Sequence, residues 1–183
     1  MSGRLVHYAG GLALGAAVDL VGTSAGAWGR SDAVALAAVA AVTAGGELSP
    51  DVDQFGWWRL LDRLLPDEAL GAGGPLQHRG ITHWIAWPPL MAGGWAVLLS
   101  VFPGLPWWLG FGVALGWASH LLLDSVFGRA VRSPDGRVVV RAGVPTMPWW
   151  RHRGGAFRSG GLASSVTGVL LVACVAGGLF LRR

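Results

Sequence analysis

Histidine and aspartate residues gather at four places along the chain, and their types are those of a metal site. The candidate ligands are His7, Asp51, Asp53, His78, His83, His120 and Asp124. The chain has only five His, and four of them belong to this set. Imidazole nitrogens together with carboxylate oxygens suit Zn, and also Mn or Fe, better than Ca. Seven ligands exceed what one tetrahedral ion takes, so we expect two divalent ions, with Zn favoured.

The spacing within each group indicates how the side chains are presented. His120 and Asp124 are four residues apart and share a helix face, so they can bind one ion, or the Asp can orient the His. The carboxylates of Asp51 and Asp53 follow Pro50, at a helix end or in a loop. Acids that only cap a helix are also common at such places. His78 and His83 are too far apart around a helix to share a face. We therefore expect His78 in a loop and His83 in the first turn of a helix.

Two ions about 3.5–4 Å apart can activate a water and hold both oxygens of a phosphoester displacement. Arg79 lies between two candidate ligands and could clamp a phosphate oxygen, although pairing with a nearby Asp or with lipid headgroups is equally open. Glu47 is a further candidate ligand or base. His152, between two Arg, is expected at the surface. Asp19, within an apolar stretch, is either functional or marks an early helix end.

The composition indicates an integral membrane protein made of one domain, residues 1–183. Hydrophobic residues make up 52% and charged residues only 13% of the 183 residues, about half the charged share of soluble domains. All fourteen basic residues are Arg, which excludes a Lys Schiff base. The single Cys174 forms no internal disulfide.

Apolar stretches predict an all-α polytopic bundle of about five transmembrane helices. The stretches are residues 5–29, 33–46, 80–123 and 160–181. Residues 80–123 contain no Asp, Glu or Arg over twice the ~20 residues of one crossing, and residues 102–106 supply a turn between two helices. The first stretch resembles a signal peptide, but cleavage would discard His7, so we expect it to remain. Between helices four and five, a turn at 133–136 and a strand at 137–141 predict a small hairpin.

Alternating crossings bring all the candidate ligands to one membrane face. That side carries eleven of the fourteen Arg, so the positive-inside tendency predicts a cytoplasmic site and an external C-terminus. The Arg residues are spread over loops beside apolar spans, which favours contact with membrane lipid and not with nucleic acid. We expect a multi-pass protein of a bacterial-type inner membrane.

The sequence resembles the YdjM-like family of inner-membrane, metal-dependent hydrolases. The resemblance lies in His7, the P-D-x-D run at 50–53, the H-R-G-x-T-H run at 78–83 and the S-H-x-x-x-D run at 119–124, with a further match at 143–148. The family is thought to be distantly related to zinc-dependent phospholipase C and P1-type nucleases. The resemblance implies a helical fold, a metal site and hydrolysis of a phosphoester.

Other functions are open on the sequence alone. Phosphatidic-acid-type lipid phosphatases need a Lys-containing motif and P-S-G-H, and metalloproteases need H-E-x-x-H; none of these is in the chain. A non-enzymatic metal transporter or sensor would place its ligands near the bilayer midplane, whereas these lie at one edge. A structural membrane protein with capping acids and buried His is the third possibility.

Overall fold

The computed structural model describes residues 2–46, 48–51, 81–127, 131–132 and 138–140. Within these ranges the chain is almost entirely helical. The helices are α1 (Ser2–Ser24), α2 (Arg30–Gly45), the short 3-10 helix η2 (Ile81–His83), α5 (Trp87–Val101) and α6 (Trp107–Phe127). Two short strands, β1 (Val131–Arg132) and β2 (Val138–Val140), pair antiparallel.

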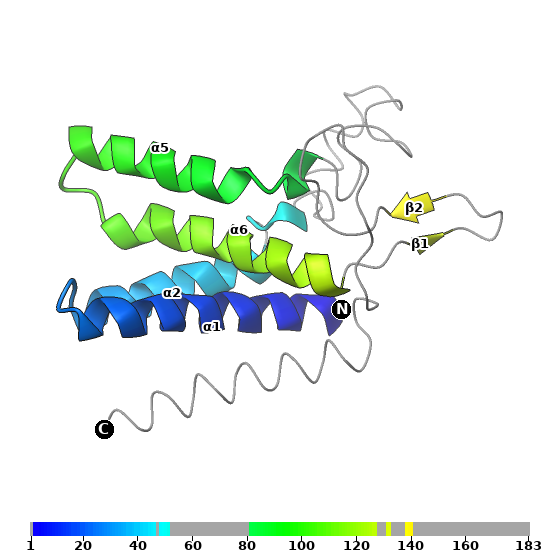
Figure 1. Ribbon diagram of the computed structural model, residues 1–183, viewed down its shortest axis with the longest axis horizontal. Coiled ribbons are helices and arrows are strands. Elements are labelled where there is room, and N and C mark those ends of the chain that lie inside the picture. The colour runs from blue at the N-terminus through cyan, green and yellow to red at the C-terminus, as the bar shows by residue number, and fades with distance from the viewer. Residues whose placement is uncertain (1, 47, 52–80, 128–130, 133–137, 141–183) are drawn as a thin grey trace.

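Three of the helices pack against one another, and the fourth lies on one of them. α1, α2 and α6 are in mutual contact, and α5 packs on α6 (Figure 1). Local sequence explains the ends of α5. Pro occupies its first turn, where the missing N–H costs nothing, and residues 102–106 turn the chain into α6, with Leu105 N–H donating to the Phe102 carbonyl at 3.1 Å.

Small residues allow the helix backbones to approach closely. A Cβ atom on Gly11 of α1 would lie 2.7 Å from the Ala44 Cβ of α2, and one on Gly15 would lie 2.6 Å from the Ala37 Cα. On α6, a Cβ on Gly116 would lie 2.6 Å from the Ala40 carbonyl oxygen. Such distances are too short for any side chain, so these glycines set the spacing of the bundle.

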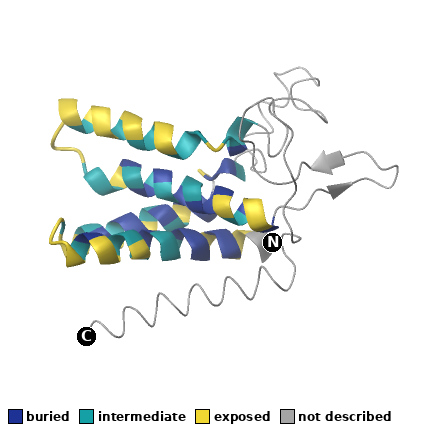
Figure 2. Ribbon diagram, viewed as in Figure 1, coloured by how far each residue is buried: buried dark blue, intermediate teal, exposed yellow. Residues whose placement is uncertain are grey.

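The core is narrow, and large apolar side chains remain on its outside. The buried apolar residues are mostly Ala, and α5 has no buried residue (Figure 2). On α5, Leu90, Val97 and Val101 are all more than half exposed. Exposed apolar faces of this kind are typical of helices that contact lipid, where apolar surface needs no burial.

The predicted count of five crossings is not confirmed. Helices occupy the first four predicted spans, and the fifth, residues 160–181, lies outside the described residues. In the described part of the chain, two helices are long and apolar enough to cross a membrane, Arg4–Ser24 and Trp107–Phe127. α2 has 16 residues and α5 has 15, fewer than the ~20 of a full crossing.

The predicted loop hairpin falls partly within the described chain. A strand was expected at residues 137–141, and β2 covers Val138–Val140 with β1 as its partner. The expected turn at 133–136 lies outside the described residues.

Candidate metal centre

The helix ends that carry His and Asp meet at one end of the bundle. His7 is near the start of α1, Asp51 follows the end of α2, His83 ends η2 just before α5, and His120 and Asp124 are near the end of α6 (Figure 1). Four of these side chains are buried, and Asp51 is 15% exposed. The structure therefore brings together five of the seven candidate ligands, from four separate parts of the chain.

Two imidazoles and two carboxylates form the centre of this group, which we call the His/Asp cluster: Asp51, His83, His120 and Asp124. One donor atom from each residue lies within 4.8 Å of the others. The Nε2 atom of His83 is 3.2 Å from Asp51 Oδ1 and 3.3 Å from Asp124 Oδ2. The Nε2 atom of His120 is 3.4 Å from Asp51 Oδ1 and 3.8 Å from Asp124 Oδ2.

The spacing of these atoms fits a metal ion. Bonds of ~2.0–2.1 Å in tetrahedral geometry place neighbouring ligand atoms about 3.3 Å apart. The four His-to-Asp separations, from 3.2 to 3.8 Å, lie close to that value. Two buried carboxylates also need positive charge nearby, because an uncompensated buried charge is costly. The cluster could therefore hold a divalent cation.

The orientation of His120 follows from a bond on its other nitrogen. Its Nδ1 lies 2.7 Å from the Ala44 carbonyl oxygen of α2. A carbonyl oxygen can only accept, so Nδ1 donates, and the neutral ring carries its lone pair on Nε2. In the described part of the chain this buried Nε2 has no hydrogen-bond partner. A ring fixed in this way presents a nitrogen ready for a metal.

The charged groups of the cluster shift the pKa values of His83 and Asp51. Burial alone would lower the pKa of His83, but its hydrogen bonds to Asp124 and Asp51 and their charges raise it above the usual value. Burial would likewise raise the pKa of Asp51, yet His120 and His83 hold it well below the usual value. Both carboxylates are therefore set up to face positive charge.

His7 lies beside the cluster and not within it. Its ring stacks on that of His120, with centroids 3.9 Å apart and planes at 14°. Its Nε2 is 3.6 Å from Asp124 Oδ1, and its buried Nδ1 has no hydrogen-bond partner among the described residues. His7 is thus placed to pack the His120 ring and to contact the outer oxygen of Asp124.

Several predicted site residues cannot be placed. Asp53, His78, Arg79 and Glu47 lie outside the described residues, as does His152, which was expected at the surface.

The structure adds detail to the expectations for Asp19 and His83. Asp19 accepts bonds from Thr23 Oγ1 at 3.3 Å and Trp28 Nε1 at 3.4 Å, and α1 continues past it to Ser24. His83 lies in η2 and not in the first turn of α5. Pro88 and Pro89 have no N–H to donate to the carbonyls four residues before them, so α5 cannot extend back toward His83 and starts at Trp87.

Backbone carbonyls that position the cluster were not anticipated from the sequence. Trp117 Nε1 donates to the Leu48 carbonyl at 2.7 Å, which holds the segment leading to Asp51. Trp87 Nε1 donates to the Ile81 carbonyl at 2.7 Å, which holds η2 and with it His83. The sequence gives one sign of these contacts: a Trp lies close to His83, and another lies close to His120. Backbone acceptors cannot be recognised from residue types.

The fold and the cluster together define a helical membrane protein with a buried His/Asp candidate metal centre. The chain belongs to a family described as YdjM inner membrane protein, whose family model matches residues 1–181. Comparison with curated proteins and with solved structures found no match.

Proposed function

We propose that the chain is a membrane-bound, metal-dependent hydrolase that cleaves a phosphoester. The observation that carries the proposal is the His/Asp cluster, whose four donor atoms lie within 4.8 Å of one another at the end of an apolar helical bundle. Mixed nitrogen and oxygen ligands favour Zn, with Mn or Fe as further candidates. The substrate is a phospholipid or another phosphate compound close to the membrane.

The residues of the cluster hold the ion and are themselves held by the fold. His120 is oriented by the Ala44 carbonyl, and Asp124 lies one helical turn further along the same face of α6. A divalent ion supplies a bound water of lowered pKa and polarises a phosphoryl oxygen. Asp51, the most exposed of the four at 15%, lies where substrate and water reach the cluster.

The remaining predicted residues complete the proposal. His7, Asp53 and His78 are the remaining proposed ligands of the two ions. Arg79 is the proposed phosphate clamp, and Glu47 the proposed base or further ligand. The proposed topology is multi-pass, with the cluster facing the cytoplasm on the Arg-rich side and the C-terminus outside.

Hydrolysis by purified full-length protein tests this function. The protein in detergent is stripped with a chelator, reloaded with Zn, Mn or Fe, and assayed on bis-p-nitrophenyl phosphate and on phospholipid vesicles. We expect turnover by loaded protein, loss of turnover on stripping, and no turnover by His83→Ala. Val97→Ala, at an exposed site on α5 (66% exposed), is the matched control and should retain turnover.

Two outcomes would overturn the proposal in different ways. Protein that binds metal in the cluster but cleaves neither substrate with any of the three ions would be a metal transporter or sensor. Protein that binds no metal would have a structural role, with the cluster acting as a network of buried ion pairs.

A further inference from the structure

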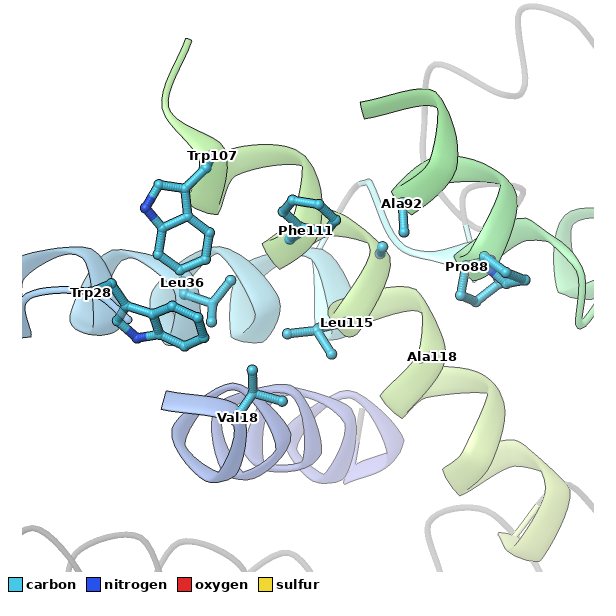
Figure 3. Close-up of a pocket in the computed structure, with 11 residues that line it drawn as sticks. Val18, Trp28, Leu36, Pro88, Ala92, Trp107, Phe111, Leu115 and Ala118 are labelled. Atoms are coloured by element: carbon cyan, nitrogen blue, oxygen red, sulfur yellow. The ribbon is translucent and has the colours of Figure 1, made fainter. Parts of the chain in front are cut away.

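An apolar cavity of about 490 Å³ lies between the helices (Figure 3). Its walls include Val18 of α1, Leu36 of α2, Ala92 of α5, and Phe111 and Leu115 of α6. Its volume is within the ~300–1,000 Å³ typical of ligand sites. Ala118 ends its wall on α6, two residues before His120, and residues two apart point to different sides of a helix.

Among the described residues, no side chain of the cavity wall can hold a polar ligand. These lining side chains are all apolar or aromatic, and the side-chain N–H groups among them belong to Trp28 and Trp107. Both indoles already have acceptors: Trp28 Nε1 donates to Asp19 Oδ1 at 3.4 Å, and Trp107 Nε1 donates to Asp32 Oδ2 at 3.3 Å. An apolar cavity excludes water and takes up apolar molecules, so its ligand is a hydrocarbon.

The two tryptophans line one end of the cavity. Their rings are in contact, with centroids 4.6 Å apart (Figure 3), and the Trp28 ring also lies directly against Gly22 of α1. Trp28 lies in the α1–α2 connection and Trp107 at the start of α6, both at the end of the bundle opposite the cluster. At the other end, the described wall includes Pro88 and Ala118.

The length of the cavity matches one leaflet of a bilayer. Trp107 and Ala118 are eleven residues apart on α6, which is about 16 Å at helical rise. The hydrocarbon core of a bilayer is ~30 Å thick, so one leaflet is about 15 Å. The cavity runs along α6, a candidate membrane span, in a chain of an inner-membrane family.

We propose that this cavity holds one acyl chain of a membrane lipid. The carboxyl end of the chain, next to the headgroup, lies at Trp28 and Trp107 near the membrane surface, and the methyl end reaches Pro88 and Ala118. The inference goes beyond the proposed function, because the cavity and the cluster use different residues and either can be disabled alone.

Photo-crosslinking with full-length protein tests the proposal. The protein is reconstituted in vesicles of phosphatidylethanolamine and phosphatidylglycerol, with a phosphatidylglycerol that carries a diazirine near either the methyl or the carboxyl end of one chain. Adducts are located by peptide mass spectrometry. We expect the carboxyl-end probe to label Trp28, Leu36 and Trp107, and the methyl-end probe to label Pro88 and Ala118.

A matched pair of variants separates the cavity from general lipid contact. Ala92→Phe fills the cavity and should reduce labelling of Phe111 and Leu115 at least about tenfold, which corresponds to about 1.4 kcal/mol. Ala96→Phe adds the same ring one turn away, at an exposed position outside the cavity, and should leave that labelling unchanged. The elution volume of the variants in detergent on a size-exclusion column serves as the check of folding and should equal that of the wild type.

Three results would overturn the proposal. The first is absence of lipid adducts at Phe111 and Leu115 in the wild type, which would point to protein as the occupant. The second is equal labelling of those residues in the wild type and Ala92→Phe. The third is labelling in the reverse order, with the methyl-end probe at the two tryptophans.

Discussion

His120 on α6 donates its Nδ1 hydrogen to the Ala44 carbonyl oxygen of α2, at 2.7 Å. The bond ties two helices together and directs the other ring nitrogen, Nε2, at the carboxylates of the cluster. Fold and candidate chemistry therefore share one side chain. The two ring nitrogens of His120 have different roles, and substitutions at this position can distinguish those roles.

His120→Asn should keep the fold but lose the metal. The Asn amide nitrogen can replace Nδ1 as the donor to Ala44, but nothing replaces Nε2 as a ligand. His120→Ala removes both, so it should also be less stable than His120→Asn by about 1 kcal/mol, the value of one hydrogen bond. Thermal unfolding of the metal-free proteins measures the difference. Equal stability of the two variants would show that the bond to Ala44 contributes nothing.

Removal of the metal should lower the melting temperature of the wild type. A ligand present at 100 times its dissociation constant stabilises the folded state by about 2.7 kcal/mol. Chelation removes that contribution and leaves Asp51 and Asp124 facing each other without the ion. Scanning fluorimetry in detergent, with and without chelator, measures the shift. His83→Ala is the control, since a variant that binds no metal should not respond to chelator.

Gly11→Ala should destabilise the bundle by about 1–3 kcal/mol, the usual cost of overpacking. Its Cβ would meet the Ala44 Cβ at 2.7 Å, so α1 and α2 would have to separate. Gly93→Ala on α5 is the matched control, because its Cβ would have no atom within 4 Å, and Ala favours a helix. Denaturation in detergent compares them. A Gly93→Ala loss as large as that of Gly11→Ala would argue against close packing as the cause.

Trp117→Phe should weaken metal binding without removing a ligand. The substitution abolishes the bond to the Leu48 carbonyl that holds the segment before Asp51. Loss of such an orienting contact typically costs 10–100-fold in metal affinity, which competition with a metal-binding dye can measure. Trp95→Phe loses a comparable bond, to the Trp107 carbonyl, away from the cluster, and should bind metal normally. Equal affinity of Trp117→Phe and the wild type would remove Leu48 as a positioning contact.

Sequence spacing was sufficient to predict that distant His and Asp residues meet at one end of a helical bundle. Alternating apolar stretches require it, and His83, His120, Asp51 and Asp124 do lie together. Membership of the family was also predicted correctly from short motifs. The first success follows from the periodic pattern of apolar stretches, which can be read along the chain, and the second from the motifs themselves.

Other features depend on contacts that residue types do not encode. The stacking of His7 on His120 follows from the close approach of α1 to α6 and could not be predicted from residue types. Asp19 accepts a bond from Trp28, and Asp32 accepts one from Trp107. These bonds, and the apolar cavity beside the two tryptophans, depend on how far apart the helices pack. The roles of Asp53, His78, Arg79 and Glu47 stay predictions.

Metal analysis of the purified full-length chain tests the central claim most directly. Inductively coupled plasma mass spectrometry should find at least one tightly bound divalent ion per wild-type chain. Little or no metal should remain in His83→Ala or Asp124→Ala, while Val97→Ala should match the wild type. A wild type without metal, or unchanged metal content in both cluster variants, would contradict a metal centre at Asp51, His83, His120 and Asp124.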